Sequence, residues 1–168
     1  MLPDDALVIG LGGNVGGEAA VIERFRRARE ALAQLGPRVR SAPLYRTAPI
    51  GPEQPAFVNS AVRLRYADGT PGELISTILE IERLLGRDRG GEPRNGPRAI
   101  DLDILLWGPR AMRTPELEIP HPRLVERRFA LQPLVDLFGD DLPLAGTTAG
   151  ALLRGVAAQS VELIASDW

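Results

Sequence analysis

The chain alternates short segments of two-residue apolar periodicity with longer segments of helical periodicity. Residues 6–12, 57–66 and 100–107 place apolar side chains at every second position for much of their length, which is typical of half-buried β-strands. Residues 39–45 show the same pattern less regularly. We therefore predict four strands, separated by loops rich in glycine and proline.

Two segments between these strands carry apolar residues at helical spacing. The first, 18–35, stops at Gly36-Pro37. The second opens with Thr70-Pro71-Gly72-Glu73, which supplies an N-cap, a proline at the first helical position and a capping-box glutamate. The predicted order is βαββαβ. This is an α+β fold of ferredoxin-like type, with an antiparallel sheet and both helices on one face.

The pattern weakens after Gly108. Residues 112–113 and 117–119 are candidate edge strands, 127–137 and 148–158 are candidate helices, and 161–164 is a candidate final strand. No internal repeat, low-complexity tract or linker is evident. We therefore expect one domain over residues 1–168, with the extra C-terminal helices packed on the sheet.

Composition narrows the possible functions. The net charge of −2 argues against a nucleic-acid or membrane-surface binder. The absence of cysteine excludes a disulfide framework, thiolate chemistry and cysteine-based zinc sites. No apolar run reaches the length of a membrane span, and the first residues carry two aspartates and no basic segment. We therefore expect no signal peptide and a cytoplasmic location.

All 20 basic residues are arginine. A Walker-type P-loop, a lysine Schiff base and the catalytic lysine of protein kinases are therefore excluded. Any phosphate must be bound by arginine, histidine, a metal ion or backbone N–H groups.

Candidate chemistry concentrates in the last predicted core strand. Asp101 and Asp103 alternate with apolar residues, so both carboxylates project from one face, roughly 6–7 Å apart. Carboxylates suit hard divalent cations, and arginine forks suit phosphate oxygens. An Asp-x-Asp pair beside arginines can also form simple ion pairs, but burying two charges in an apolar strand favours a compensating metal. Five arginines lie just upstream: Arg83, Arg87, Arg89, Arg94 and Arg98.

Two other motifs are less specific. The glycine-rich turn 10–17 departs from the G-x-G-x-x-G dinucleotide pattern and predicts only a tight strand-to-helix turn. His121 is the only histidine, and single histidines are more often structural than catalytic. His121 nevertheless has a proline on each side and arginines nearby, at 123, 127 and 128. These neighbours indicate a site that binds an anion.

Taken in order, five segments closely resemble the 6-hydroxymethyl-7,8-dihydropterin pyrophosphokinase family of folate biosynthesis. They are GLGGNVGG, APLYRTAPIGPEQPAFVNSAV, EIERLLGR, NGPRAIDLDILLWG and EIPHPRLVERRFALQPL, and together they span roughly residues 7–137. The family has a ferredoxin-like fold, in agreement with the order predicted above. The resemblance implies transfer of the β,γ-pyrophosphoryl group of ATP to the hydroxymethyl group of the reduced pterin, with release of AMP.

The resemblance also implies roles for individual residues. Asp101 and Asp103 match the family's ligands of two Mg²⁺ ions, and Arg89 and Arg94 match arginines that assist the transfer. The positions implied for ATP are Glu82, Arg87, Arg98, Ile104, His121 and Arg127. The positions implied for the pterin are Thr47, Ala48, Pro49, Ile50, Gly51, Phe57, Asn59 and Phe129.

The pterin assignments have a physical basis. A flat heteroaromatic ring suits stacking between Phe57 and Phe129, and the Asn59 amide matches a ring edge that alternates donors and acceptors. Without the resemblance, both phenylalanines would be assigned to an ordinary core. Both substrates are small molecules, and we expect a monomer or a weak homodimer.

Three departures from the family pattern affect the site. Gly13 replaces the usual serine of the first turn, Asn95 stands where some members carry a bulky aromatic residue, and the loop 89–96 is one residue longer. The last difference leaves the roles of Arg89 and Arg94 open. Two other functions stay open as well: a different Mg²⁺/ATP phosphotransferase or hydrolase, and a non-catalytic module that binds RNA or a partner protein.

Overall fold

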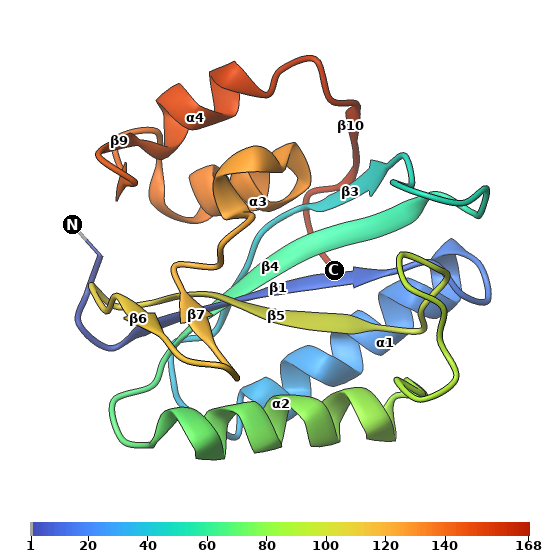
Figure 1. Ribbon diagram of the computed structural model, residues 1–168, viewed down its shortest axis with the longest axis horizontal. Helices are drawn as coiled ribbons and strands as arrows, with labels where there is room; N and C mark the ends of the chain where they lie inside the picture. Colours follow the sequence, from blue (N-terminus) through green and yellow to red (C-terminus); the bar gives the residue numbers. More distant parts are fainter. Residues whose placement is uncertain (1) are drawn as a thin grey trace.

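The computed structural model describes residues 2–168, and an antiparallel sheet lies at its centre (Figure 1). Its strands run in the order β10-β3-β4-β1-β5, and the short strand β2 pairs with β4. Every pair of neighbouring strands is antiparallel. The strands are β1 (Ala6–Gly13), β2 (Arg40–Ser41), β3 (Leu44–Thr47), β4 (Phe57–Arg65), β5 (Asp101–Trp107) and β10 (Val161–Ala165).

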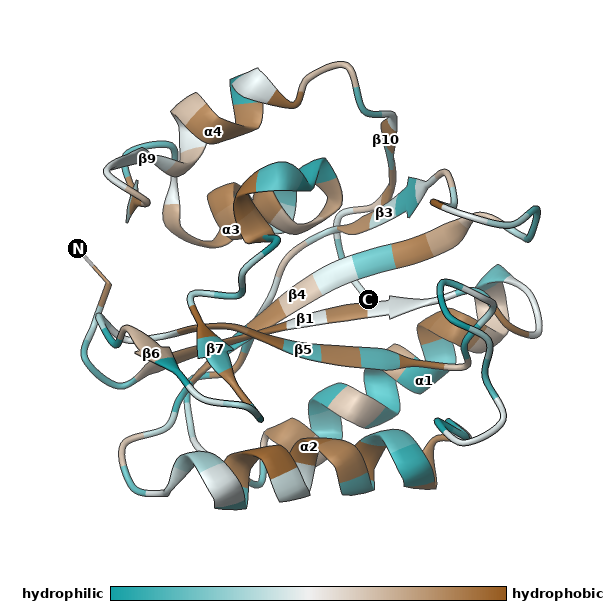
Figure 2. Ribbon diagram, in the orientation of Figure 1, coloured by the Kyte–Doolittle hydropathy of each residue, from teal (hydrophilic) through white to brown (hydrophobic). Residues whose placement is uncertain are grey.

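Helices cover both faces of this sheet. The first core is built by α1 (Glu18–Leu32) and α2 (Pro71–Leu84), and the second by α3 (Arg128–Phe138) and α4 (Ala149–Gly155) on the opposite face (Figure 1). Both α2 and α3 are brown along part of their surface and teal elsewhere, as expected of helices that bury one side (Figure 2).

Short elements complete the structure. Strands β6 (Met112–Arg113) and β7 (Glu118–Ile119) form one hairpin, and β8 (Pro143–Leu144) and β9 (Thr147–Thr148) form another. A 3₁₀ turn, Leu124–Glu126, leads into α3. No helix within residues 2–168 is long and apolar enough to cross a membrane.

The predicted α+β, ferredoxin-like order is confirmed, and the extra C-terminal helices lie on the second face. The predicted strand 39–45 is instead two strands with a break at Ala42-Pro43, because proline has no N–H to donate to a ladder. Strand β3 also runs to Thr47, two residues beyond the predicted strand 39–45 and into the loop expected before residue 57. The β8–β9 hairpin was not predicted, because its strands of two residues are too short to show a period.

Strand β1 presents two different faces. Leu7, Ile9 and Leu11 lie in the first core, beneath α1 and α2. On the other face, Gly10 and Gly12 carry no side chain. A Cβ atom at Gly12 would lie 3.0 Å from the Asn59 Oδ1 atom, and one at Gly10 would lie 3.2 Å from the Leu105 side chain. The centre of the sheet is therefore bare on the α3 side.

The N-terminus of α2 carries the capping box that the sequence predicts. The Thr70 Oγ1 atom accepts a hydrogen bond from the Glu73 N–H at 3.2 Å, and a Glu73 carboxylate oxygen accepts one from the Thr70 N–H at 2.8 Å. Two backbone donors that would otherwise lack partners are thereby satisfied.

We predict that Thr70→Ala lowers the free energy of unfolding by about 1 kcal/mol, because this cap is lost. Urea denaturation measures the change. Ser76→Ala is the matched control, since Ser76 is exposed inside the same helix and alanine favours helix there. Equal stability of Thr70→Ala and the wild type would contradict a stabilising role for the cap.

Candidate active site

A cleft lies over the bare centre of the sheet, between β1 and the segment that leads into α3. Its floor is strand β1, and residues from β3, β4, β5, α3 and three loops form its walls. The lining residues are Gly10, Leu11, Gly12, Thr47, Ala48, Ile50, Phe57, Asn59, Ser60, Asn95, Arg98, Asp101, Asp103, Leu105, His121, Arg123, Leu124, Arg127, Phe129 and Ala130.

Strand register divides the cleft into two sides. Gly12 pairs with Asn59 of β4 on one side and with Asp101 of β5 on the other. Gly10 pairs with Asp103. The two glycines thus separate an acidic edge from an amide and aromatic wall, and they leave room for a ligand to approach the backbone between them.

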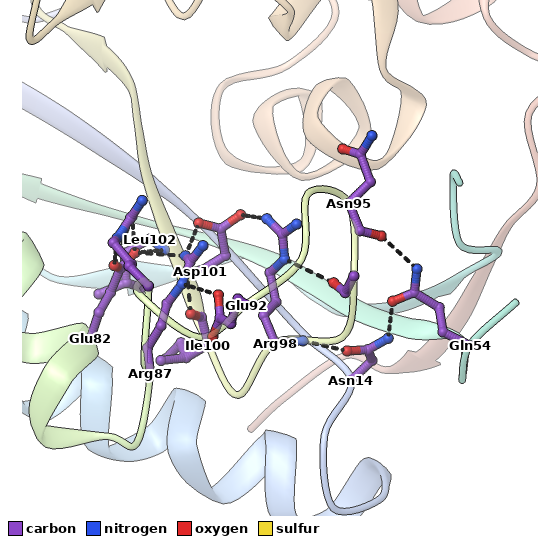
Figure 3. Close-up of polar contacts among 12 residues, drawn as sticks. Asn14, Gln54, Glu82, Arg87, Glu92, Asn95, Arg98, Ile100, Asp101 and Leu102 are labelled. Atoms are coloured by element: carbon purple, nitrogen blue, oxygen red, sulfur yellow. Dashed lines mark hydrogen bonds and ion pairs between the residues drawn. The ribbon is translucent and has the colours of Figure 1, made fainter. Parts of the chain in front are cut away.

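The two aspartates of the acidic edge are held in different ways. The Asp101 carboxylate accepts hydrogen bonds from Arg87 at 2.5 Å and from Arg98 at 2.9 Å. Burial acts to raise the pKa of Asp101, but these two guanidinium groups outweigh it and hold the pKa below its usual range. Asp101 therefore carries its charge with two fixed partners (Figure 3).

Within residues 2–168, no ion pair or hydrogen bond reaches the carboxylate of Asp103. Burial, followed by the negative charges of Asp101 and Glu82, raises the pKa of Asp103 to about 7. The positive charges of Arg127 and Arg87 oppose this rise in pKa but do not cancel it.

The donor set of the acidic edge fits a magnesium ion. No group of three or more potential ligand side chains occurs within residues 2–168. Magnesium is often held by only one or two carboxylates together with substrate phosphates, because it keeps several of its waters. Asp101 and Asp103, on one face of β5, meet that requirement.

Behind this edge, Glu82 of α2 is buried and joins three groups. One of its oxygens accepts the Leu102 N–H at 2.8 Å, and its carboxylate pairs with Arg87 at 3.3 Å and Arg89 at 2.8 Å. Burial raises the pKa of Glu82, while these three contacts oppose the shift. Arg87 also pairs with Glu92 at 3.0 Å, so α2, the arginine-rich loop and β5 form one charged network (Figure 3).

On the opposite wall, Asn59 is buried and has a fixed orientation. Its Nδ2 atom donates a hydrogen bond to the Thr47 hydroxyl at 2.6 Å. Phe57 and Phe129 line the cleft nearby, and the Arg127 guanidinium lies 5.5 Å from the centre of the Phe129 ring. This wall combines apolar faces with an oriented amide, as a flat heteroaromatic ligand requires.

The family comparison accounts for this arrangement. A family model described as 7,8-dihydro-6-hydroxymethylpterin-pyrophosphokinase (HPPK) matches residues 8–139. The chain belongs to the HPPK family.

The relatives of this HPPK chain agree with the assignment. A Synechocystis protein named 2-amino-4-hydroxy-6-hydroxymethyldihydropteridine pyrophosphokinase is 37% identical over 161 residues, covering 94% of this chain and 80% of its own. A Bacillus subtilis protein of the same name is 38% identical over 135 residues, covering 77% and 75%.

Longer proteins match as well. A mitochondrial folate synthesis bifunctional protein of Pisum sativum is 43% identical over 138 residues, which make up 81% of this chain but 26% of that protein. The HPPK chain thus spans about a quarter of this longer relative. The structure of Plasmodium falciparum HPPK-DHPS with pteroate aligns with a TM-score of 0.70 at 15% identity, covering 94% of this chain and 43% of that one, and so supports the fold.

The structure brings most of the predicted HPPK site residues together. Eleven of them line the cleft: Thr47, Ala48, Ile50, Phe57, Asn59, Arg98, Asp101, Asp103, His121, Arg127 and Phe129. Burial and the nearby Arg127 lower the pKa of His121, which favours its neutral form. The His121 Nδ1 atom accepts the Arg123 N–H at 3.2 Å, so a neutral ring carries its proton on Nε2.

Seven predicted residues lie outside the lining. Pro49 and Gly51 belong to the same loop as Ala48 and Ile50. Glu82, Arg87 and Arg89 form the network behind the acidic edge, Arg94 is exposed, and the Ile104 side chain lies in the first core.

Sequence reasoning missed part of the lining. Gly10 and Gly12 were assigned to the end of the first strand and the turn after it, without a role in a site, although their alternation with Ile9 and Leu11 indicates a bare strand face. Packing in this structure explains the glycine at position 13, where the sequence departs from the family pattern. A Cβ atom at this position would lie 2.7 Å from the Ala99 carbonyl oxygen.

Other missed positions carried no separate sequence signal. These are Ser60, Leu105, Leu124 and Ala130, whereas Arg123 was noted beside His121 but given no role. Leu105 reaches the cleft because a register shift in β5 places both Leu105 and Leu106 in the second core.

We predict that Glu82→Ala lowers the free energy of unfolding by about 3 kcal/mol, because it leaves buried Arg87 with one fewer partner and the Leu102 N–H with none. Chemical denaturation measures this loss. Glu80→Ala, on an exposed face of the same helix, removes an ion pair with Arg83 and should leave stability within error. Equal effects of the two substitutions would contradict the role given to Glu82.

Proposed function

We propose that this protein transfers the β,γ-pyrophosphoryl group of ATP to the hydroxymethyl group of 6-hydroxymethyl-7,8-dihydropterin and releases AMP. In this reaction the hydroxymethyl oxygen forms a bond to the β-phosphorus and loses its proton. The bond between the β-phosphorus and the oxygen that stays on AMP breaks. The observation that carries the proposal is a single cleft with an Asp-x-Asp edge on one side of a glycine strand and an oriented amide with aromatic walls on the other.

The amide and aromatic wall suits the pterin. The Asn59 amide, fixed by Thr47, keeps its carbonyl oxygen and one N–H available to the donors and acceptors of the pterin edge. Phe57 and Phe129 offer apolar faces to the two sides of the ring. A ring held in this way directs its hydroxymethyl group across Gly12 toward the acidic edge.

The opposite side suits a polyphosphate. Arg98, His121 and Arg127 belong to the cleft lining, with Arg127 also beside the Phe129 ring, and they supply hydrogen-bond donors without any lysine. Arginine forks hold phosphate oxygens in pairs, and a neutral His121 adds one further N–H donor. Arg89 and Arg94, on the exposed loop beside the cleft, are proposed to assist the transfer when the loop covers the substrates.

Asp101 and Asp103 would hold two Mg²⁺ ions together with the phosphates of ATP. When bound, magnesium neutralises charge on the phosphate oxygens. This assignment is supported by the position of both carboxylates in the cleft lining, on one face of β5. The cytoplasmic location and the monomeric or weakly dimeric state stay predictions.

A nucleotide product assay tests the proposed reaction. The protein is incubated with ATP and Mg²⁺, with and without 6-hydroxymethyl-7,8-dihydropterin, and the nucleotides are separated by chromatography. We expect AMP only when the pterin is present, and we expect Asp103→Ala to abolish AMP formation while the protein stays folded. ADP as the product, or turnover that ignores the pterin, would point to a different phosphotransferase or hydrolase.

We predict that Asn59→Ala raises the KM for the pterin by about 10-fold to 100-fold, which corresponds to the loss of one or two buried hydrogen bonds. Nucleotide affinity should change little, because Asn59 lies across Gly12 from the acidic edge. Thr47→Ser, which keeps the hydroxyl that orients the amide, serves as the control. Parallel losses of pterin and nucleotide binding would contradict this division of the cleft.

A further inference from the structure

The first turn of α3 carries part of the aromatic wall. Phe129 and Ala130 lie in this turn and line the cleft. Arg127, the residue before the helix, makes no side-chain cap hydrogen bond there. The apolar side of α3 packs against the sheet in the second core (Figure 1). Apolar contacts are non-directional, so they fix the position of a helix along its own axis less sharply than a hydrogen bond does.

One hydrogen bond joins α3 to strand β3. The Tyr45 hydroxyl donates to the Asp136 Oδ2 atom at 2.6 Å, the length expected of a hydroxyl that binds a carboxylate. Gln132, one turn earlier in the helix, donates to the Asp136 Oδ1 atom at 3.2 Å. Within residues 2–168, the Tyr45–Asp136 bond is the only hydrogen bond between α3 and a strand of the main sheet. We call it the α3 anchor.

Tyr45 is well suited to be a permanent donor. Its side chain is buried, and this burial, followed by the hydrogen bond to Asp136 and the negative charge there, raises the pKa of Tyr45 above its usual range. The hydroxyl therefore keeps its proton throughout the physiological pH range, and the α3 anchor persists with it.

The α3 anchor connects both sides of the pterin wall. Along β3, Tyr45 and Thr47 are two positions apart and share one face, and Thr47 binds the Asn59 amide. Along α3, Asp136 lies seven positions after Phe129, which is about 10 Å and roughly two turns away on the same side of the helix. The strand that orients the amide is thus bonded to the helix that carries the ring.

We propose that Tyr45 and Asp136 are positioning residues for the pterin ring. Their hydrogen bond sets the distance between Phe129 and Phe57, and so the width of the slot between these two rings. The inference deepens the proposed function and rests on it. A flat ring needs a slot of constant width, because a gap of roughly 0.5–1 Å already forfeits a quarter to a half of each dispersion contact.

Three substitutions isolate the α3 anchor. Tyr45→Phe removes only the hydroxyl, and Asp136→Asn keeps an oxygen that accepts the Tyr45 O–H. Tyr66→Phe makes the same change at the only other tyrosine of the chain. It is the matched control, because Tyr66 is buried in the first core beside Trp107 and lies outside the cleft lining.

Titration calorimetry measures the affinity for 6-hydroxymethyl-7,8-dihydropterin, with Mg²⁺ and α,β-methylene ATP present throughout and at a temperature where circular dichroism shows every variant folded. We expect Tyr45→Phe to weaken pterin binding by about threefold to tenfold, the factor that one aromatic contact contributes. Asp136→Asn and Tyr66→Phe should stay within about twofold of the wild type. Wild-type affinity in Tyr45→Phe, or an equal loss in Tyr66→Phe, would overturn the proposal.

A double-mutant cycle shows whether Tyr45 acts through Phe129. Phe129→Leu removes the ring whose position is in question. In that background we expect Tyr45→Phe to weaken pterin binding by less than about twofold further, whereas an effect that does not pass through Phe129 would add in full. Full additivity would overturn the positioning role.

Hydrogen exchange in the ligand-free protein separates this proposal from the proposed function. We expect Tyr45→Phe to accelerate amide exchange in residues 128–138 and Tyr66→Phe to leave that helix unchanged. Unchanged exchange in Tyr45→Phe would overturn the α3 anchor whichever reaction the protein catalyses. Accelerated exchange in a protein that forms no AMP in the product assay would instead leave the anchor intact and reject the pyrophosphoryl transfer.

Discussion

The buried carboxylate of Glu82 is the contact on which the acidic side of the cleft depends. Strand β5 is an edge strand, so the outward-facing Leu102 N–H has no neighbouring strand to bind it, and Glu82 supplies the acceptor. The same carboxylate compensates Arg87, which in turn holds Asp101. An edge that would otherwise be open to pairing with another chain is thereby closed by α2 and made part of a charged network.

The floor of the cleft depends on the absence of side chains at Gly10 and Gly12 of β1. Side chains on the first-core face of β1 are large and fully packed, whereas the α3 face carries hydrogen atoms only at Gly10 and Gly12. One strand thus provides both the centre of the hydrophobic core and the floor of the cleft. Because the aspartates and Asn59 lie on the strands that flank β1, their separation is set by the spacing of strands in the sheet rather than by flexible loops.

The sequence predicted the fold and much of the site because both depend on local patterns. The two-residue and helical periods locate the core elements, and the Asp101/Asp103 alternation places both carboxylates on one face. The resemblance to a family supplied the proposed pterin residues Phe57 and Phe129, which pattern alone would have assigned to a core. Contacts such as Tyr45–Asp136 and Glu82–Leu102 were not predictable, because each joins segments that only the folded chain brings together. The register shift at Leu105 likewise depends on a pairing partner that periodicity does not identify, whereas the break at Pro43 follows from a proline that the sequence already shows.

The position of β1 also has a consequence for synthesis on the ribosome. Of the strands in the main sheet, β1 comes first along the chain, and its two partners, β4 and β5, lie roughly 50 and 95 residues later. At the roughly 5–20 residues per second of translation, β1 waits on the order of 5–20 s for β5. For about half of that interval β1 has no sheet partner, and after β4 is made the edge of β1 that β5 will cover stays open. The nascent chain is therefore expected to be a substrate for chaperones until residue 107 has left the exit tunnel.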